Sequence, residues 1–353
     1  MLKRKINIRK YRYEIFLYAV FVLINSIPCF FLTVPVFVDG LNTIAVSAYM
    51  SGSDWHRYLY ADGYYYKYGM TVLYLPLFYL FCSPVVLYRA MLLLNVLAAG
   101  AVPVIAYKIA VDYLNIRKKE NALLIAGVTA FLPALTLNIK YTWAETVLLV
   151  SPWMILLLLL RIHEDGDAGK QVRDSILIAC SSVFAYMAHQ RGIVVVLATF
   201  LTVIYIRFVR KKANLRIGFY LVTAMVLLIA DRFMDRLVKQ YVFNADVNTA
   251  NSTFSLWDAN MWDRLLSFTG LQTIIKIIYG WLFNVFTGSG GLVCLGLCVI
   301  LVCFFRYRSG EKRYYIHLIS VFSLLCFVGA FALGGIFFFS DIYLYYTGEM
   351  VRR

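Results

Sequence analysis

Acidic side chains lie beside the apolar segments of this chain, where a carboxylate can take part in proton transfer. Asp39 comes shortly after the first apolar segment, and partial desolvation there would raise the basicity of its carboxylate. A segment with the apolar spacing of a helix follows Asp39, so Asp39 could simply cap that helix, and this alternative stays open. Glu145 lies at the start of a later apolar segment, where an ionisable group is costly unless it has a function or reaches the interface. Both residues are candidates for chemistry.

Basic and imidazole side chains lie at the ends of other apolar segments. His189, Gln190 and Arg191 form a very short connection, so His189 and Arg191 must point to the same rim. Cations held at one membrane face can bind a phosphate on a lipid. Lys140 ends another apolar segment, and interfacial snorkelling is the preferred interpretation for it. We therefore expect an anion site at His189 and Arg191.

A third group of candidates is the tripeptide Asp54-Trp55-His56. It could supply a second acid, a metal ligand or a ring that stacks on a sugar, although such triplets also occur by chance in loops. The sequence contains no GxGxxG, P-loop or HExxH motif, which excludes nucleotide-driven and zincin-type chemistry. Its seven cysteines lie in or beside apolar segments and indicate neither a disulfide framework nor a zinc site.

The elements that must position these residues are long apolar segments. Hydrophobic residues make up 62% of the 353-residue chain, and an apolar run of about 20 residues crosses a bilayer as a helix. The pattern predicts an all-α polytopic membrane protein that forms a single transmembrane domain over residues 1–353. The nine predicted spans cover residues 13–36, 84–112, 121–139, 143–160, 174–189, 192–209, 217–232, 279–305 and 314–338.

The net charge of +15 is distributed asymmetrically among the connections. The N-terminus holds six Lys and Arg residues, and the connections at 113–120, 161–173, 207–216 and 306–313 hold three, three, five and four. The intervening short connections carry only Arg57, Lys67, Lys140 and Arg191, and the long segment at 231–278 is charge-balanced. The positive-inside rule then predicts a cytoplasmic N-terminus, and the basic surplus indicates topology and anionic lipid rather than nucleic acid.

Two predicted external loops are too long to be simple turns: residues 37–83 and 231–278. In the first loop, apolar spacing predicts one helix over residues 39–51 and another over 70–81, with the second lying in the membrane interface. Tyr66 belongs to a tyrosine-rich stretch between them that suits the headgroup level.

The motifs along the chain resemble those of the GT-C superfamily of membrane glycosyltransferases. An acidic residue after the first span is followed by AYMSGSDWH, YYYKYG, LYRAMLLLNVL, AHQRG and a terminal YYTGE, in an order that extends over essentially the whole chain. The resemblance implies a polyprenyl-phosphate-sugar-dependent transferase, similar to protein O-mannosyltransferases and the aminoarabinose transferase of lipid A. It also implies that the active face is extracytoplasmic. The lack of targeting signals beyond the first apolar segment is compatible with a bacterial plasma membrane.

By this resemblance, Asp39 would deprotonate an acceptor hydroxyl on a glycan, lipid or protein. His189, Arg191 and Lys140 would bind the phosphate of the donor, and loop aromatics such as Trp55 and Tyr66 would shape the sugar and acceptor sites. Some relatives use a divalent cation (Mg or Mn) and many use none; Asp54, His56 and Glu145 are the candidate ligands, and no metal site is assigned.

The chain departs from the family pattern in two places. Gly40 follows Asp39 where many relatives carry a second acidic residue, and the chain ends at Arg353 where relatives commonly continue. The alternatives are a transporter or flippase of lipid-linked sugars and a polymerase or ligase of surface polysaccharide.

Overall fold

The regular structure of the described residues is entirely helical. The computed structural model describes residues 11–31, 38–53, 67–164, 167–209, 215–242, 267–273, 275, 290–306 and 313–347. The helices are α1 (Arg12–Phe31), α2 (Val38–Met50), α4 (Thr71–Leu80), α5 (Pro84–Ala99), α6 (Ala101–Lys108), η2 (Ile109–Tyr113), α7 (Lys119–Ala130), α8 (Pro133–Asn138), α9 (Glu145–Glu164), α10 (Ala168–Ala188), η3 (Gln190–Gly192), α11 (Ile193–Ile204), η4 (Tyr205–Val209), α12 (Ile217–Tyr241), α15 (Gly290–Arg306) and α16 (Arg313–Thr347).

Within these described ranges, six helical stretches are long and apolar enough to cross a membrane. They are Arg12–Phe31, Pro84–Tyr113, Glu145–Ile162, Gln190–Phe208, Ile217–Tyr241 and Arg313–Ala330. Their outward faces carry many large apolar side chains, as a lipid-facing surface requires. The prediction of an all-α membrane protein is therefore supported by the fold.

One of the predicted spans, residues 121–139, is not a continuous helix. It divides into α7, of 12 residues, and α8, of 6 residues. Leu132 adopts a ψ of 128° immediately before Pro133, because a proline ring disfavours the helical conformation of the preceding residue. Neither piece alone reaches the length of about 20 residues that a crossing requires.

Helix α10 is the least apolar of the long helices and one of the most buried. It contains Lys170, Arg173 and Asp174 in its first two turns, and it packs against α9 and α12. Its 21 residues give a length of roughly 30 Å at 1.5 Å per residue. The largest core cluster lies along it, with Ile178 and Ala179 packed among residues of α9, α11 and α12.

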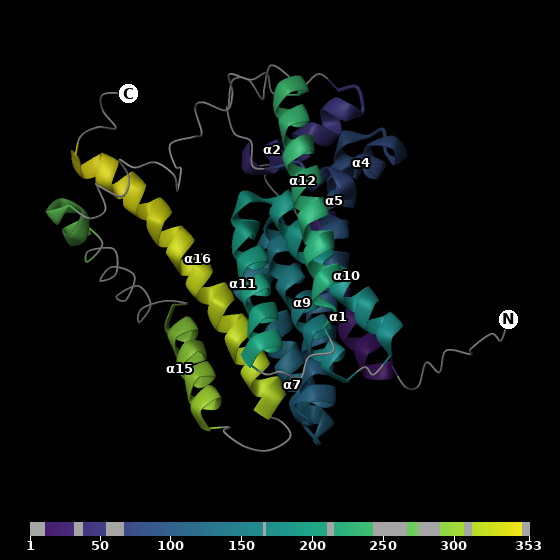
Figure 1. The fold of residues 1–353 in the computed structure, drawn as a ribbon. Coiled ribbons are helices and arrows are strands. Elements are labelled where there is room, and N and C mark those ends of the chain that lie inside the picture. Colours follow the sequence, from purple (N-terminus) through teal and green to yellow (C-terminus); the bar gives the residue numbers. More distant parts are fainter. Residues whose placement is uncertain are drawn as a thin grey trace.

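The two ends of the bundle differ in character. At one end α2 and α4 pack together beside the C-terminal half of α12, and α15 and α16 lie on the far side of α11 (Figure 1). Helices α2 and α4 were predicted from apolar spacing within the 37–83 loop, and both are confirmed as helices. We refer to this end, where α10 also finishes, as the α2 end.

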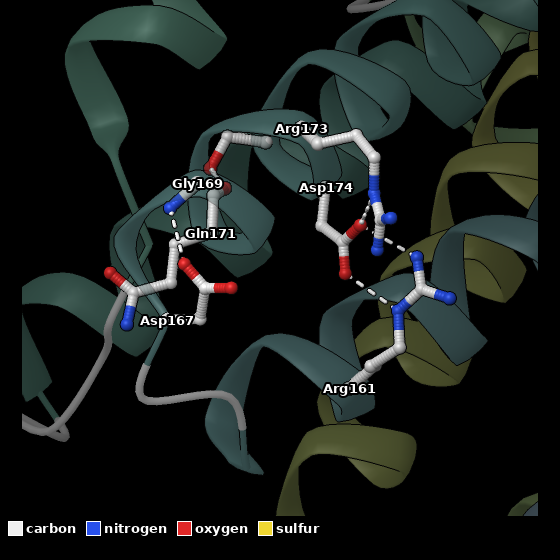
Figure 2. A network of polar contacts seen from close by, with 7 residues as sticks. Arg161, Asp167, Gly169, Gln171, Arg173 and Asp174 are labelled. Carbon is white, nitrogen blue, oxygen red and sulfur yellow. Dashed lines mark hydrogen bonds and ion pairs between the residues drawn. The ribbon is translucent and has the colours of Figure 1, made fainter. Parts of the chain in front are cut away.

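The opposite end contains a buried carboxylate between two arginines. Asp174 is fully buried; it accepts hydrogen bonds from Arg161 Nε and a second guanidinium nitrogen, each at 2.6 Å, and from Arg173 Nε at 3.1 Å (Figure 2). Asp167 caps α10 by accepting a hydrogen bond from the Gly169 N–H at 2.9 Å. These contacts fix the α9–α10 hairpin at the end that carries basic connections.

Candidate functional site

The first turn of α2 lies directly against the segment that leads into α9. A Cβ added at Gly40 would lie 2.6 Å from Thr142 Oγ1, so this close approach requires glycine. Asp39 precedes Gly40 in the same turn; its side chain lies outside the described part of the structure. The predicted base is therefore carried by a helix end that contacts residues just before Glu145.

The segment before α9 is held in place by a buried polar chain. Asn95 of α5 donates a hydrogen bond from Nδ2 to the Tyr141 carbonyl at 2.8 Å, and its Oδ1 accepts one from the Tyr74 hydroxyl at 3.0 Å. The Tyr141 ring stacks on Trp143 with centroids 4.3 Å apart. Lys140 belongs to this segment and is half-buried, so this predicted site residue also lies at the α2 end.

Two of the predicted site residues form an ion pair across the bundle. Glu145 is the first residue of α9, and its Oε1 lies 3.6 Å from a terminal guanidinium nitrogen of Arg191. The Arg191 side chain is 58% exposed and that of Glu145 is 28% exposed. An ion pair of this length and exposure is weak, so Arg191 can exchange this carboxylate for another anion.

His189 ends α10 in an extended conformation and caps the turn that follows. Its Nδ1 accepts a hydrogen bond from the Arg191 backbone N–H at 3.0 Å, and its side chain is buried. Burial, assisted by the charge of Arg191, lowers the pKa of His189 from its ordinary value of 6.5 to about 4. The expectation that His189 supplies a positive charge does not fit this environment: at neutral pH it is an uncharged acceptor.

The α2 end also contains a buried ion-pair network that the sequence did not indicate. Lys67 Nζ lies 2.7 Å from Asp231 Oδ2 and 3.6 Å from Asp235 Oδ1, and it lies 4.3 Å above the Tyr186 ring. The side chains of Lys67 and Asp231 are only 5% and 3% exposed. In the sequence, the only signals for this network were Lys67 within a run of tyrosines and the spacing of four residues between Asp231 and Asp235.

This network joins α12 to the end of α10. The Gly69 N–H donates a hydrogen bond to the Met187 carbonyl at 2.7 Å, and a Cβ at Gly69 would lie 2.4 Å from the Met187 carbonyl carbon. Asp231 lies in a predicted loop, residues 231–278, but α12 continues through it to Tyr241. The first part of the predicted external loop is thus helical, and its face bearing Asp231 and Val238 is buried against Lys67 and Tyr68.

Tyr68 lies next to these carboxylates and is buried. Burial raises its pKa, and the negative charges of Asp231 and Asp235 raise it further. The phenol therefore stays protonated at any physiological pH and can act as a hydrogen-bond donor.

The remaining candidates, Asp54, Trp55, His56 and Tyr66, lie outside the described residues. Within the residues that the structure does describe, no group of three or more His, Cys, Asp or Glu side chains is arranged to hold a metal ion. Of the three candidate metal ligands, only Glu145 is described, and it forms an ion pair with Arg191. The divalent cation stays a prediction.

The described residues thus bring together at one end of the bundle the helix turn carrying Asp39, the segment carrying Lys140, and the Glu145–Arg191 pair. No known protein family, no curated protein and no solved structure matches this chain.

Proposed function

We propose that the protein is a membrane glycosyltransferase that moves a sugar from a polyprenyl-phosphate donor to an acceptor hydroxyl. The observation that carries this proposal is the convergence at the α2 end. The turn carrying Asp39 contacts Thr142, and Glu145, which starts the next helix, pairs with Arg191 at 3.6 Å. An acid and an exchangeable cation thus lie on neighbouring elements at one end of the bundle.

In the proposed reaction, the acceptor oxygen forms a bond to the anomeric carbon of the sugar. The bond between that carbon and the phosphate oxygen breaks, and its electron pair leaves with the lipid phosphate. The acceptor proton passes to Asp39 as general base. Arg191, with Lys140 from the neighbouring segment, stabilises the charge that develops on the leaving phosphate. His189 remains neutral and holds the Arg191 turn.

The topology belongs to the same proposal. In this proposed topology the chain crosses the membrane nine times, with α7 and α8 together forming one crossing. Its N-terminus lies in the cytoplasm and the α2 end at the extracytoplasmic face of a plasma membrane. Support comes from the basic residues that belong to the described helices at the opposite end, such as Arg161 of α9 and Arg173 of α10. Nucleotide sugars are absent from the extracytoplasmic side, so a lipid-linked donor suits this face. A divalent cation bound through Glu145 remains part of the proposal as an option.

The proposal is tested by removing the base and the cation separately. Asp39→Asn should abolish sugar transfer from a polyprenyl-phosphate donor, while Arg191→Met should reduce it at least tenfold and weaken donor binding. Asp167→Asn is the matched control: Asn also caps helices, and residue 167 lies at the opposite end, so transfer should be unchanged. Full transfer by Asp39→Asn at normal protein levels would refute the assignment of the base.

One observation favours a second candidate, a transporter or flippase of lipid-linked sugars. Asp231 and Lys67 form a buried ion pair within reach of a candidate span, and ionisable groups there often belong to a transport path. Movement of a lipid-linked sugar across reconstituted vesicles, without any covalent product, would support this second function over the first.

A further inference from the structure

The Glu145–Arg191 ion pair places a negative charge directly beside the cation to which the proposed function assigns the lipid phosphate. Glu145 Oε1 lies 3.6 Å from a terminal guanidinium nitrogen of Arg191. Both side chains are partly exposed, so the pair is weak and open to exchange. A phosphate that binds Arg191 must displace this carboxylate, and it then lies next to the carboxylate it has displaced.

The two residues cannot move far apart, because both backbones are fixed. Glu145 is the first residue of α9, and the segment before it is held by the hydrogen bond from Asn95 to the Tyr141 carbonyl. Arg191 follows α10, which packs along α9, and the Arg191 N–H bonds to His189. A change of rotamer breaks the pair but leaves the carboxylate well within the Debye length of about 8 Å, so it still acts on an anion at Arg191.

The other charged groups at the α2 end leave this carboxylate in effect. Burial makes His189 neutral, and Lys67 is already paired with two aspartates. Lys140, on the segment before α9, is half-buried. Arg191 and Lys140 are thus the cations that the proposed function assigns to the phosphate, and Glu145 offsets part of their charge.

The two phosphate species of the proposed reaction differ in charge. The sugar donor is a phosphodiester, which carries a single negative charge. The lipid phosphate that remains after transfer is a monoester, whose second ionisation has a pKa of about 6, so it carries nearly two negative charges at neutral pH. Displacing Glu145 from Arg191 costs the same for both ligands, whereas repulsion from Glu145 acts about twice as strongly on the monoester.

A site built from cations alone would favour the wrong species. Attraction to Arg191 and Lys140 also grows with the charge of the phosphate, so the product would bind more tightly than the donor and would block the site. A carboxylate beside the cations reduces this difference, because it subtracts more from the binding of the product.

We propose that Glu145 is a specificity-determining residue that shifts the preference of the site from the phosphate monoester product towards the sugar-bearing phosphodiester donor. The inference rests on the proposed function, and it gives Glu145 a role other than metal binding. After transfer, Glu145 repels the lipid phosphate and pairs with Arg191 again, which returns the site to the state seen in the structure.

The test compares two lipids that carry no sugar: polyprenyl phosphate, a monoester, and its methyl phosphodiester. They share one lipid chain and differ by nearly one charge at neutral pH. Glu145→Gln should tighten the binding of both lipids, and that of the monoester about fivefold more, which is the factor for one further unit charge at about 4 Å in water. In a transfer assay, the variant should lower the Ki of polyprenyl phosphate relative to the donor KM by the same factor.

Two further variants separate charge from structure. Glu145→Asp keeps the charge, so the ratio of the two affinities should stay close to that of the wild-type protein. Glu120→Gln is the matched control, because Glu120 is an exposed acid in the first turn of α7, which follows η2 at the opposite end of the bundle (Figure 1). Its loss should change neither affinity.

Each other outcome overturns a definite statement. Equal tightening of both lipids by Glu145→Gln, no change in either, or an equal shift of the ratio in Glu145→Asp would refute discrimination by charge, while the transferase stands. Weaker binding of both lipids by Glu145→Gln would also refute it and would support a metal ion at Glu145. If the wild-type protein binds neither lipid, the proposed function fails together with the inference.

Discussion

At the scale of single residues, the environment of a group decides its role more than its type. His189 and Arg191 are neighbours in one turn, yet His189 is buried and Arg191 is more than half exposed. The two were expected to act alike as cations. The turn instead combines an uncharged acceptor, which holds the backbone, with a guanidinium that faces the exterior.

The lowered pKa of His189 predicts a specific dependence of stability on pH. Unfolding returns the pKa of His189 from about 4 to its ordinary 6.5, so the unfolded chain binds a proton that the folded protein excludes. The contribution to stability is complete above pH 6.5 and is lost as the pH falls from 6.5 to about 4. The loss is on the order of 3 kcal/mol.

His189→Asn provides the measurement, since Asn can still accept the Arg191 N–H hydrogen bond through its side-chain oxygen but does not titrate. Melting temperatures recorded from pH 7 to pH 4 should fall less steeply for this variant than for the wild-type protein. Parallel curves for the two proteins would show that His189 does not titrate as described.

At the scale of elements, the Lys67 network joins three parts of the chain that are distant in sequence. Lys67 precedes α4, Asp231 and Asp235 belong to α12, and Tyr186 lies in the last turn of α10. Because Gly69 also bonds to Met187, the segment at 67–70 fixes the end of α10 immediately before His189. The geometry of the Arg191 turn thus depends on a contact between distant helices.

Lys67→Met should destabilise the protein by about 3–5 kcal/mol, because it leaves Asp231 buried without its cation. The double variant Lys67→Met with Asp231→Asn should recover much of this loss, since no unpaired charge remains. Thermal unfolding in detergent or nanodiscs measures both.

Lys239→Met is the matched control for this pair. Lys239 lies 2.9 Å from Asp235, but its side chain is 34% exposed, so its removal should cost less than about 1 kcal/mol. Equal losses for Lys67→Met and Lys239→Met would contradict the distinction between a buried pair and a surface pair.

At the scale of the whole molecule, the two ends of the bundle differ in their polar groups. One end holds α2, Arg191 and the Lys67 network, and the other holds the Arg161–Asp174–Arg173 cluster. If the bundle spans a bilayer, these ends contact different aqueous compartments.

Accessibility labelling tests this arrangement with single cysteines introduced into a variant that lacks the seven native ones. Ser53→Cys, next to α2, should react with a membrane-impermeant reagent added to intact cells. Lys118→Cys, before α7, should react only after the membrane is permeabilised. Reaction of both positions from the same side would disprove the proposed topology.

Sequence patterns predicted the local features of the fold better than the pairing of residues. The helix expected over 39–51 is observed at Val38–Met50, because apolar spacing is a property of a single segment. The Glu145–Arg191 contact and the burial of Asp231 depend on which helices pack together, and no local pattern carries that information.

The buried Asp174 of α10 has a consequence for how the chain enters the membrane. A segment that begins with Lys170, Arg173 and Asp174 partitions into lipid by itself less readily than an uninterrupted apolar helix. Arg161, at the end of α9, neutralises Asp174 through two short hydrogen bonds. We therefore expect α9 and α10 to leave the translocon together as a helical hairpin, because the contact with α9 lowers the cost of inserting α10 during synthesis.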